Sequence, residues 1–180
     1  MSKEQAIIKL IPVFRQYGYE GTTLSLLSKA SGLGKASLYH YFPGGKDEMV
    51  SAVFEYVSAC FYDIVLKPLH LEDSPARKIQ MMGENLKQFY DNGNKSCFLA
   101  IMSFGGAKNL LHNEIEQGLK LWIETLASVL IESGIESEIA KMRSQDAIME
   151  IQGALIMVRI LDDTAPFDRL VKSMPEKLLS

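Results

Sequence analysis

The N-terminal part of the chain has apolar residues at helical spacing. One such stripe consists of Ile7, Ile8, Ile11 and Phe14. Because this spacing places the side chains on one face, the pattern predicts a first helix that packs through that face. The glycines at 18 and 21 are expected to end it, and the hydroxyls of Thr22 and Thr23 are suited to cap the next helix.

Two short helices are expected to follow, separated by a tight turn. The first covers residues 24–30, and the second runs from Lys35 to Phe42. The turn between them contains Gly32 and Gly34, and glycine readily adopts the positive φ that ends a helix. Pro43 cannot continue the third helix. Three helices with a tight middle turn form the pattern of a helix-turn-helix.

The remainder of the chain alternates long helical segments with short breaks at proline or glycine. We expect helices at residues 45–66, 75–92, 96–104, 108–133, 137–161 and 164–174. Alternation typical of β-strands is almost absent. The predicted fold class is therefore all-α with about nine helices: a helix-turn-helix head at residues 1–46 and a larger helical-bundle body at residues 47–180.

Composition and charge refine this division. The 180 residues carry a formal net charge of −3, but residues 1–46 alone have a net charge of +4 and the remainder −7. A basic head on an acidic body suggests that one end of the protein meets a polyanion. Cys60 and Cys97 lie far apart without metal-ligand spacing, and no membrane span or signal peptide is apparent. A reduced, cytoplasmic protein without a metal or other cofactor is expected.

The residues of the head closely resemble the DNA-binding signature of the tetracycline-repressor (TetR) family. The resemblance covers Phe14 to Lys46, and it rests on the paired Thr22-Thr23, the turn Ala30-Ser31-Gly32 and the run Leu38-Tyr39-His40-Tyr41-Phe42. The segment Phe42-Pro43-Gly44-Gly45-Lys46 is similar to a sub-branch with a Pro-Gly-Gly-Lys link. The resemblance implies a dimeric regulator with a ligand-binding body.

Three positions depart from the usual signature. Gly34 stands where relatives usually have Ser, and Ala36 stands where they often have Gly. Ser28 replaces a usual Ala. Gly34 removes a side-chain cap and a phosphate contact, although Gly is an acceptable N-cap. Ala36 raises helix propensity and removes a close backbone approach to DNA.

The expected DNA contacts lie at the starts of helices and on the third helix. They are Thr23, Lys35, Ala36, Ser37, Tyr39, His40 and Lys46. Lys35 and His40 are the expected base readers, because cationic and imidazole groups can bond base edges in the major groove. The hydroxyls of Ser37 and Tyr39 suit phosphate oxygens, and Thr23 and Lys46 would bring helix N-termini to the backbone.

The body is rich in aromatic and methionine side chains. As the family resemblance implies a ligand pocket, we expect its lining among Tyr56, Phe61, Met82, Phe89, Phe98, Met102, Trp122 and Gln152. Such side chains would enclose a lipophilic or aromatic small-molecule effector. The same residue types at helical spacing are also typical of an ordinary core.

Residues 147–161 are apolar nearly all round, so this helix is expected to be buried on several sides. Its own chain would cover one face of the helix, and the second subunit of a twofold-symmetric dimer would cover another face. The residues expected at this dimer interface are Ile148, Ile151, Leu155, Val158 and Phe167. A symmetric dimer would present two recognition helices to a palindromic operator.

The expected function is a DNA-binding transcriptional regulator, in the first place a repressor, that binds double-stranded operator DNA as a homodimer and is released by a small molecule. No catalytic motif surrounds the three histidines, so an enzyme is not expected. Two alternatives stay open, a regulator without an effector and a thiol sensor acting through Cys97. The sequence does not distinguish repression from activation.

Overall fold

The computed structural model describes all 180 residues, and 82% of them are helical without any strand. The predicted all-α class is confirmed. Ten α-helices are present, one more than expected, because the segment expected as one helix at 108–133 is interrupted at Leu111. This residue leaves helical geometry, with φ −116° and ψ 19°, while its side chain is buried. The helix therefore breaks at a buried leucine, and no glycine or proline in the sequence indicates this break.

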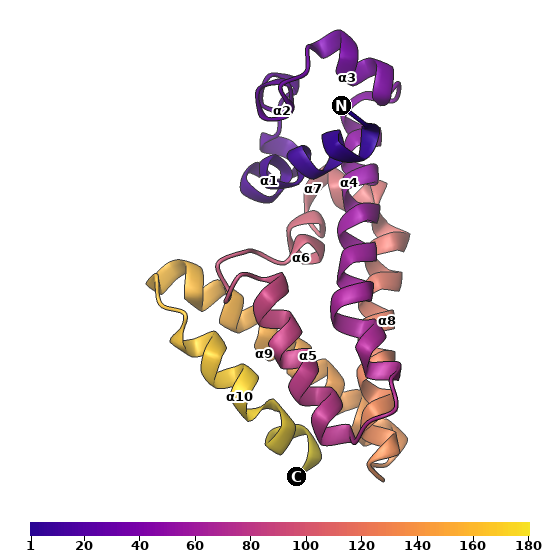
Figure 1. Cartoon of the computed structure of the whole chain (residues 1–180), viewed down its shortest axis with the longest axis vertical. Coiled ribbons are helices and arrows are strands. Elements are labelled where there is room, and N and C mark those ends of the chain that lie inside the picture. Colours follow the sequence, from indigo (N-terminus) through magenta and orange to yellow (C-terminus); the bar gives the residue numbers. More distant parts are fainter. The chain divides into compact units, whose positions relative to one another are not determined.

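The ten helices and two short turns follow one another along the chain (Figure 1). Their bounds are α1 (Lys3–Gly21), α2 (Leu24–Ser31), α3 (Lys35–Tyr41), α4 (Gly45–Phe61), a π-helical turn (Tyr62–Leu66), a 3-10 turn (Lys67–His70), α5 (Pro75–Phe89), α6 (Phe98–Met102), α7 (Gly105–Leu110), α8 (His112–Glu132), α9 (Ser137–Leu161) and α10 (Ala165–Leu179).

The chain forms two units. The first comprises Met1–Ala59 and Phe98–Glu116, and the second comprises Cys60–Cys97 and Gln117–Ser180. The first unit thus contains the predicted head together with most of α4 and the short helices α6 and α7. The boundary that we expected after residue 46 falls within this unit, because α6 and α7 pack against α1.

The core of the first unit is formed by the apolar faces of its helices. Fully buried side chains come from α1, α3, the segment after it and α4: Ala6, Leu10, Phe14, Leu38, Phe42, Met49, Val50 and Val53. Helix α1 follows the expected stripe only in part, since Ile8 is 44% exposed. Its regular helix is interrupted at Gly18, where φ is 64°, and one more turn follows before Thr22. The glycine that was expected to end α1 therefore kinks it.

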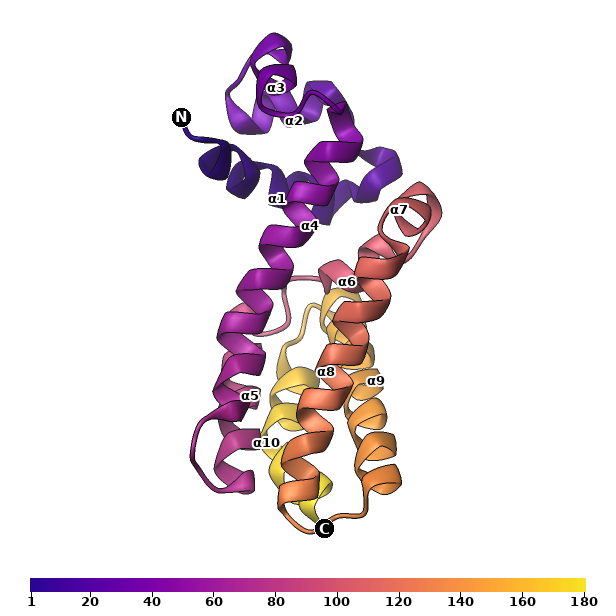
Figure 2. The ribbon, with the colours of Figure 1, turned by 90° about the vertical axis from the view of Figure 1, so that its right-hand side faces the viewer.

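In the second unit, α10 lies alongside both α5 and α9 (Figures 1 and 2). The approach of α5 to α10 is close at Gly83, where a Cβ would lie 2.8 Å from Cγ1 of Val171. Helix α10 continues through Pro175 to Leu179, beyond the expected end at residue 174. Burial of Leu178, whose carbonyl accepts a hydrogen bond from Arg143 at 2.9 Å, favours this extra turn.

The run from Gly45 to His70 is long and apolar enough to cross a membrane, by length and composition alone. Its apolar side chains Met49, Val50, Val53, Val65 and Leu66 are at most 1% exposed within the chain. Packing inside the protein covers these side chains, while 39% of the most apolar stretch of this run is buried.

Candidate DNA-binding surface

The turn between α2 and α3 is held by hydrogen bonds from its own serines. The hydroxyl of Ser31 donates to the carbonyl of Leu27 at 2.7 Å and accepts from the amide of Leu33 at 3.2 Å. The hydroxyl of Ser28 donates to the carbonyl of Leu33 at 2.6 Å. Gly32 ends α2 with φ 72°, a conformation that favours glycine. The serine at position 28, one of the departures from the family signature, thus stabilises the helix-turn-helix turn.

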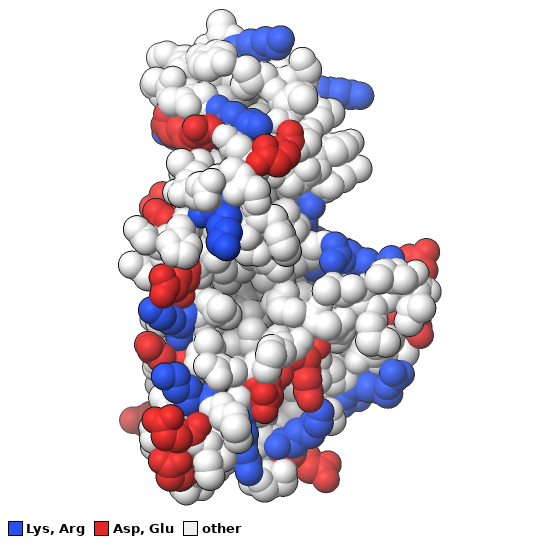
Figure 3. All heavy atoms as spheres, turned by 180° about the vertical axis from the view of Figure 1, so that it is seen from behind, with Lys and Arg blue, Asp and Glu red and all other residues white.

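Helix α3 divides into a buried and an exposed side. Leu38 on α3 and Phe42 directly after it are 0% exposed and anchor the helix in the head. The exposed side carries five of the side chains expected to contact DNA: Lys35, Ala36, Ser37, Tyr39 and His40. The tip of the head shows Lys and Arg side chains projecting outward in the view of Figure 3, whereas both signs of charge mix over the second unit. DNA contact by these residues stays a prediction that their exposure permits.

Thr23 caps α2 and is itself exposed. Its Oγ1 accepts a hydrogen bond from the amide of Leu26 at 3.3 Å, as the sequence predicted for a cap. The hydroxyl proton is not used in that bond, because Oγ1 acts there as the acceptor. Thr23 can therefore donate this proton to a phosphate oxygen while still capping the helix.

Lys46 has a different environment from the one expected. Its ammonium donates to the carbonyl of Tyr19 at 3.0 Å and to that of Thr22 at 3.3 Å, and it lies 4.1 Å from the centre of the Tyr19 ring. Helix α1 ends at these carbonyls, and that of Tyr19 also accepts a hydrogen bond from the capping amide of Thr22 at 3.3 Å. In this structure Lys46 holds the end of α1 against the start of α4, instead of projecting from the head toward a phosphate.

Tyr19 and its neighbour Glu20 join three elements of the first unit, α1, α4 and α7. The hydroxyl of Tyr19 donates to Asp47 at the start of α4, and this hydrogen bond, with burial and the negative charge of Asp47, raises the pKa of Tyr19 to about 12. The neighbouring Glu20 accepts a hydrogen bond from the amide of Gly106 at 2.6 Å. A carboxylate at the first turn of α7 is also favoured by the helix dipole. These contacts attach α7 to the end of α1.

The loop before α4 is stabilised by Glu48. Its carboxylate accepts a hydrogen bond from the amide of Gly44 at 2.8 Å and pairs with Lys3 at 3.1 Å. The hydrogen bond from Gly44, followed by that from Lys3, lowers the pKa of Glu48. The Glu48–Lys3 pair and the contacts of Tyr19 and Glu20 could not be predicted from spacing, since they join residues far apart in the chain.

The residues expected to line an effector pocket are divided between the two units. Tyr56, Phe98 and Met102 belong to the first unit, where the Phe98 ring lies 6.2 Å from that of Phe54. Phe61, Met82, Phe89, Trp122 and Gln152 belong to the second unit. There the rings of Phe61 and Trp122 are 4.8 Å apart, and those of Phe61 and Phe89 are 5.2 Å apart. Met82 is fully buried, and Gln152 is half-buried on α9.

The residues expected at a dimer interface are already covered within one chain. Five side chains are at most 5% exposed and therefore have no free surface for a second copy: Ile148, Ile151, Leu155, Val158 and Phe167. The intrachain core takes these residues, and the opposite face of α9 is exposed. Its exposed apolar side chains are Met142, Met149, Ile156, Met157 and Ile160.

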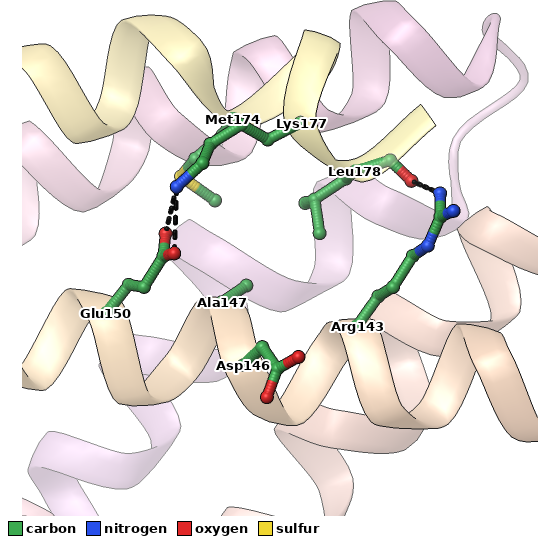
Figure 4. Close-up of a pocket in the computed structure, with 7 residues that line it drawn as sticks. All are labelled: Arg143, Asp146, Ala147, Glu150, Met174, Lys177 and Leu178. Atoms are coloured by element: carbon green, nitrogen blue, oxygen red, sulfur yellow. Dashed lines mark hydrogen bonds and ion pairs between the residues drawn. The ribbon is translucent and has the colours of Figure 1, made fainter. Parts of the chain in front are cut away.

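A hollow between α9 and α10 has a volume of about 160 Å³ (Figure 4). Three of its four charged side chains have partners, since Lys177 pairs with Glu150 at 2.8 Å and Arg143 bonds the carbonyl of Leu178. Pockets for drug-sized ligands span about 300–1,000 Å³. This hollow is therefore too small and too well paired to serve as the effector site.

The two cysteines remain free thiols. Cys97 precedes α6 and is 5% exposed, whereas Cys60 is half-buried on α4. Reactive cysteines are usually accessible, so the burial of Cys97 favours a packing role over the thiol-sensor alternative. No group of three or more His, Cys, Asp or Glu side chains is placed to hold a metal ion.

Comparisons with known proteins agree with this architecture. Residues 11–53 match the model of bacterial regulatory proteins of the tetR family. Residues 75–173, more than half of the chain, match the model of the C-terminal domain of LmrA/YxaF-like transcriptional regulators.

Similarity to individual proteins extends over the full length. The chain is 22% identical to the uncharacterized transcriptional regulator YxaF of Bacillus subtilis, covering 97% of this chain and 93% of that protein. It is 24% identical to LmrA of the same organism, covering 98% and 96%. A TetR transcriptional regulator from Legionella pneumophila has the same fold, with a TM-score of 0.85 at 19% identity over 98% of this chain and 96% of that one. The chain therefore belongs to the tetR family of helix-turn-helix transcriptional regulators, with a C-terminal domain of the LmrA/YxaF-like type.

Proposed function

We propose that this regulator is a cytoplasmic repressor that binds a palindromic operator as a homodimer and is released by a small lipophilic or aromatic effector. The observation that carries the DNA-binding part is the exposed side of α3, where Lys35, Ser37, Tyr39 and His40 are all free of the core. Support for repression comes from a partial match to a named repressor, which covers 31% of this chain. Over 59 residues the chain is 36% identical to the Staphylococcus aureus protein IcaR, which is named as a negative transcriptional regulator of a biofilm operon.

Each exposed residue has a distinct role in this proposal. Lys35 and His40 donate to base edges in the major groove, because they carry the donors on α3 that suit guanine. Ser37, Tyr39 and Thr23 donate hydroxyl protons to phosphate oxygens and so position the head. Ala36 adds an apolar contact to the bases, such as one to a thymine methyl group. Lys46 acts indirectly, by holding α1 and α4 together beneath this surface.

The second copy would dock on the exposed apolar face of α9. Ile156, Met157 and Ile160 are 48%, 47% and 76% exposed, and Met149 is 63% exposed. Contiguous exposed apolar side chains of this kind mark interfaces. Gly153, between them, has nothing within 4 Å of its would-be Cβ, so a second helix can approach closely here. A twofold pairing of this face also yields the two heads that a palindrome requires.

The repressor would leave the operator because the effector has different affinities for two arrangements of the two DNA-binding heads. Helix α4 runs from Gly45 in the first unit to Phe61 in the second, and so links the two units covalently. An effector that binds better to the arrangement unfit for DNA lowers operator affinity only by its preference for that arrangement. The Pro-Gly-Gly-Lys link at the start of α4 is proposed as the mark of a sub-branch that shares this connection.

Selection of genomic DNA fragments by the purified protein, read by gel shift at two salt concentrations, tests the proposal. We expect a short palindrome whose affinity falls steeply with salt, since each neutralised phosphate contributes about 0.9 to the slope of log K against log salt. Weak binding without sequence preference would contradict the proposal.

The dimer requires a separate test. Ile156→Glu places a charge on the proposed interface, and we expect sedimentation equilibrium to show a monomer that loses operator binding. Arg77→Glu, an exposed change on α5, is the matched control and should leave the dimer intact. A wild-type protein that is monomeric at micromolar concentration would refute this part.

A further inference from the structure

Four aromatic rings from three helices form one cluster around Phe61 in the second unit. Phe61, the last residue of α4, has ring centres 4.8 Å from Trp122, 5.2 Å from Phe89 and 6.5 Å from Tyr90. The cluster is graded in burial: Phe61 and Phe89 are half-buried, whereas Trp122 and Tyr90 are 1% exposed. Rings at this separation form edge-to-face pairs that offer flat apolar surface to a further ring.

The deepest member of this cluster has an unused hydrogen-bond donor. Nε1 of Trp122 is fully buried and has no acceptor within hydrogen-bonding distance. A buried indole N–H usually finds a partner, because leaving it without one costs most of the hydrogen bond that it makes with water when unfolded. Contact with a neighbouring ring face compensates only weakly. The donor thus marks a point at which an added acceptor would gain free energy.

The backbone next to the cluster is also unusual. The α-helical geometry of α4 ends at Phe61 and gives way to a π-helical turn over Tyr62–Leu66. Single π-turns within helices occur frequently at functional sites, since they widen the helix and re-aim the side chains beside it. Here the widened turn follows directly after the ring that contacts both Trp122 and Phe89.

We propose that Trp122, Phe61 and Phe89 form the recognition element for a neutral aromatic ligand with a hydrogen-bond acceptor such as a carbonyl oxygen. The Trp122 N–H donates to that oxygen, and the rings of Phe61 and Phe89 pack against the ligand ring. A neutral acceptor fits better than an anion, because one uncharged donor cannot replace the hydration of a buried negative charge. The inference rests on the proposed function, in which this ligand is the effector.

The single tryptophan makes the proposal directly measurable. In ¹⁵N-labelled protein without DNA, the indole N–H gives one resonance, and bonding to an acceptor shifts its proton downfield. The probes are acetophenone, 2-acetonaphthone and 9-fluorenone, paired with ethylbenzene, 2-ethylnaphthalene and fluorene, which have similar shape but no carbonyl.

We expect at least one carbonyl probe to move the indole resonance downfield and to bind about fivefold more tightly than its partner, the gain from one neutral hydrogen bond. Calorimetry supplies the affinities, so that the absorbance of the probes does not interfere. If no carbonyl probe moves this resonance, or if both members of every pair bind equally, the proposal is wrong.

A variant confirms the donor. Trp122→Phe removes the N–H but retains an aromatic ring, so the preference for the carbonyl member should fall to about one. Tyr90→Phe, in the same cluster, retains the indole and should keep the preference. Because the wild-type measurement needs no variant, poor folding of Trp122→Phe would leave the test decisive.

Failure of this inference can be told apart from failure of the proposed function. A downfield shift in a protein that binds no operator would retain the ligand site and refute the repressor. Operator binding in a protein whose indole resonance never moves would retain the regulator and refute this site.

Discussion

The role of Lys46 separates a structural from a DNA-contacting lysine. Lys46→Gln removes a charged donor from two carbonyls, at 3.0 and 3.3 Å, and a cation from above the Tyr19 ring. A part-buried hydrogen bond from a charged group contributes about 1 kcal/mol after discounting for solvent. The cation–π contact adds about 0.5 kcal/mol at a half-exposed site. From the two hydrogen bonds and the cation–π contact together, we therefore expect a loss of about 2.5 kcal/mol in the free energy of unfolding.

The matched control is Lys35→Gln. Lys35 is exposed at the start of α3. If Lys35 reads a base edge, its removal from both subunits weakens operator binding by about 1–3 kcal/mol for each lost contact and relaxes the sequence preference. Its unfolding free energy should not change measurably. Lys46→Gln should show the reverse, with a lower unfolding free energy but an unchanged operator affinity and salt slope.

Two measurements on both variants decide the matter. Urea unfolding is followed by circular dichroism, since the only tryptophan lies in the second unit and its fluorescence would not report on the head. Operator affinity is measured by gel shift over a series of salt concentrations. A Lys46→Gln protein of wild-type stability with a reduced salt slope would refute the structural role and restore Lys46 as a phosphate contact.

Three further predictions follow from individual contacts. Tyr39→Phe should weaken operator binding about thirtyfold in gel shifts, because a dimer loses two phosphate bonds of about 1 kcal/mol each. The control Tyr41→Phe removes a hydroxyl that bonds within the chain and should leave operator binding unchanged. Equal effects of the two variants would contradict this prediction. Because the pKa of Tyr19 is raised to about 12, the wild type should unfold with a higher free energy than Tyr19→Phe. This difference in unfolding free energy, measured by urea titration, should have its full value below pH 10 and decline as the pH rises toward 12. A difference that grew over this pH range would contradict the prediction. Gly83→Ala should lower the free energy of unfolding by about 1–2 kcal/mol in urea titrations, because the added Cβ would lie 2.8 Å from Cγ1 of Val171. The cost of this overpacking exceeds the gain in helix propensity from alanine. A more stable variant would contradict the prediction and show that the contact relaxes freely.

The sequence by itself determined the local architecture. Periodicity placed the helices, and the glycine of the helix-turn-helix turn takes the left-handed conformation expected of it. These features depend on neighbours in the chain, where spacing and turn chemistry are sufficient. The exposure of α3 was predictable for the same reason, since Leu38 and Phe42 had to face inward.

Only the tertiary structure decided which apolar side chains and hydrogen-bonding groups have partners within the chain. Ile151 and Leu155 looked suited to a partner, but the intrachain core takes them and leaves Ile156 and Ile160 exposed. On a helix that is apolar all round, spacing does not reveal which face the chain itself covers. Lys46 bonds carbonyls far from it in sequence, and the donor of Trp122 lacks an acceptor only because of what packs around it. Such long-range pairings are set by how helices meet in three dimensions, which a linear pattern does not encode.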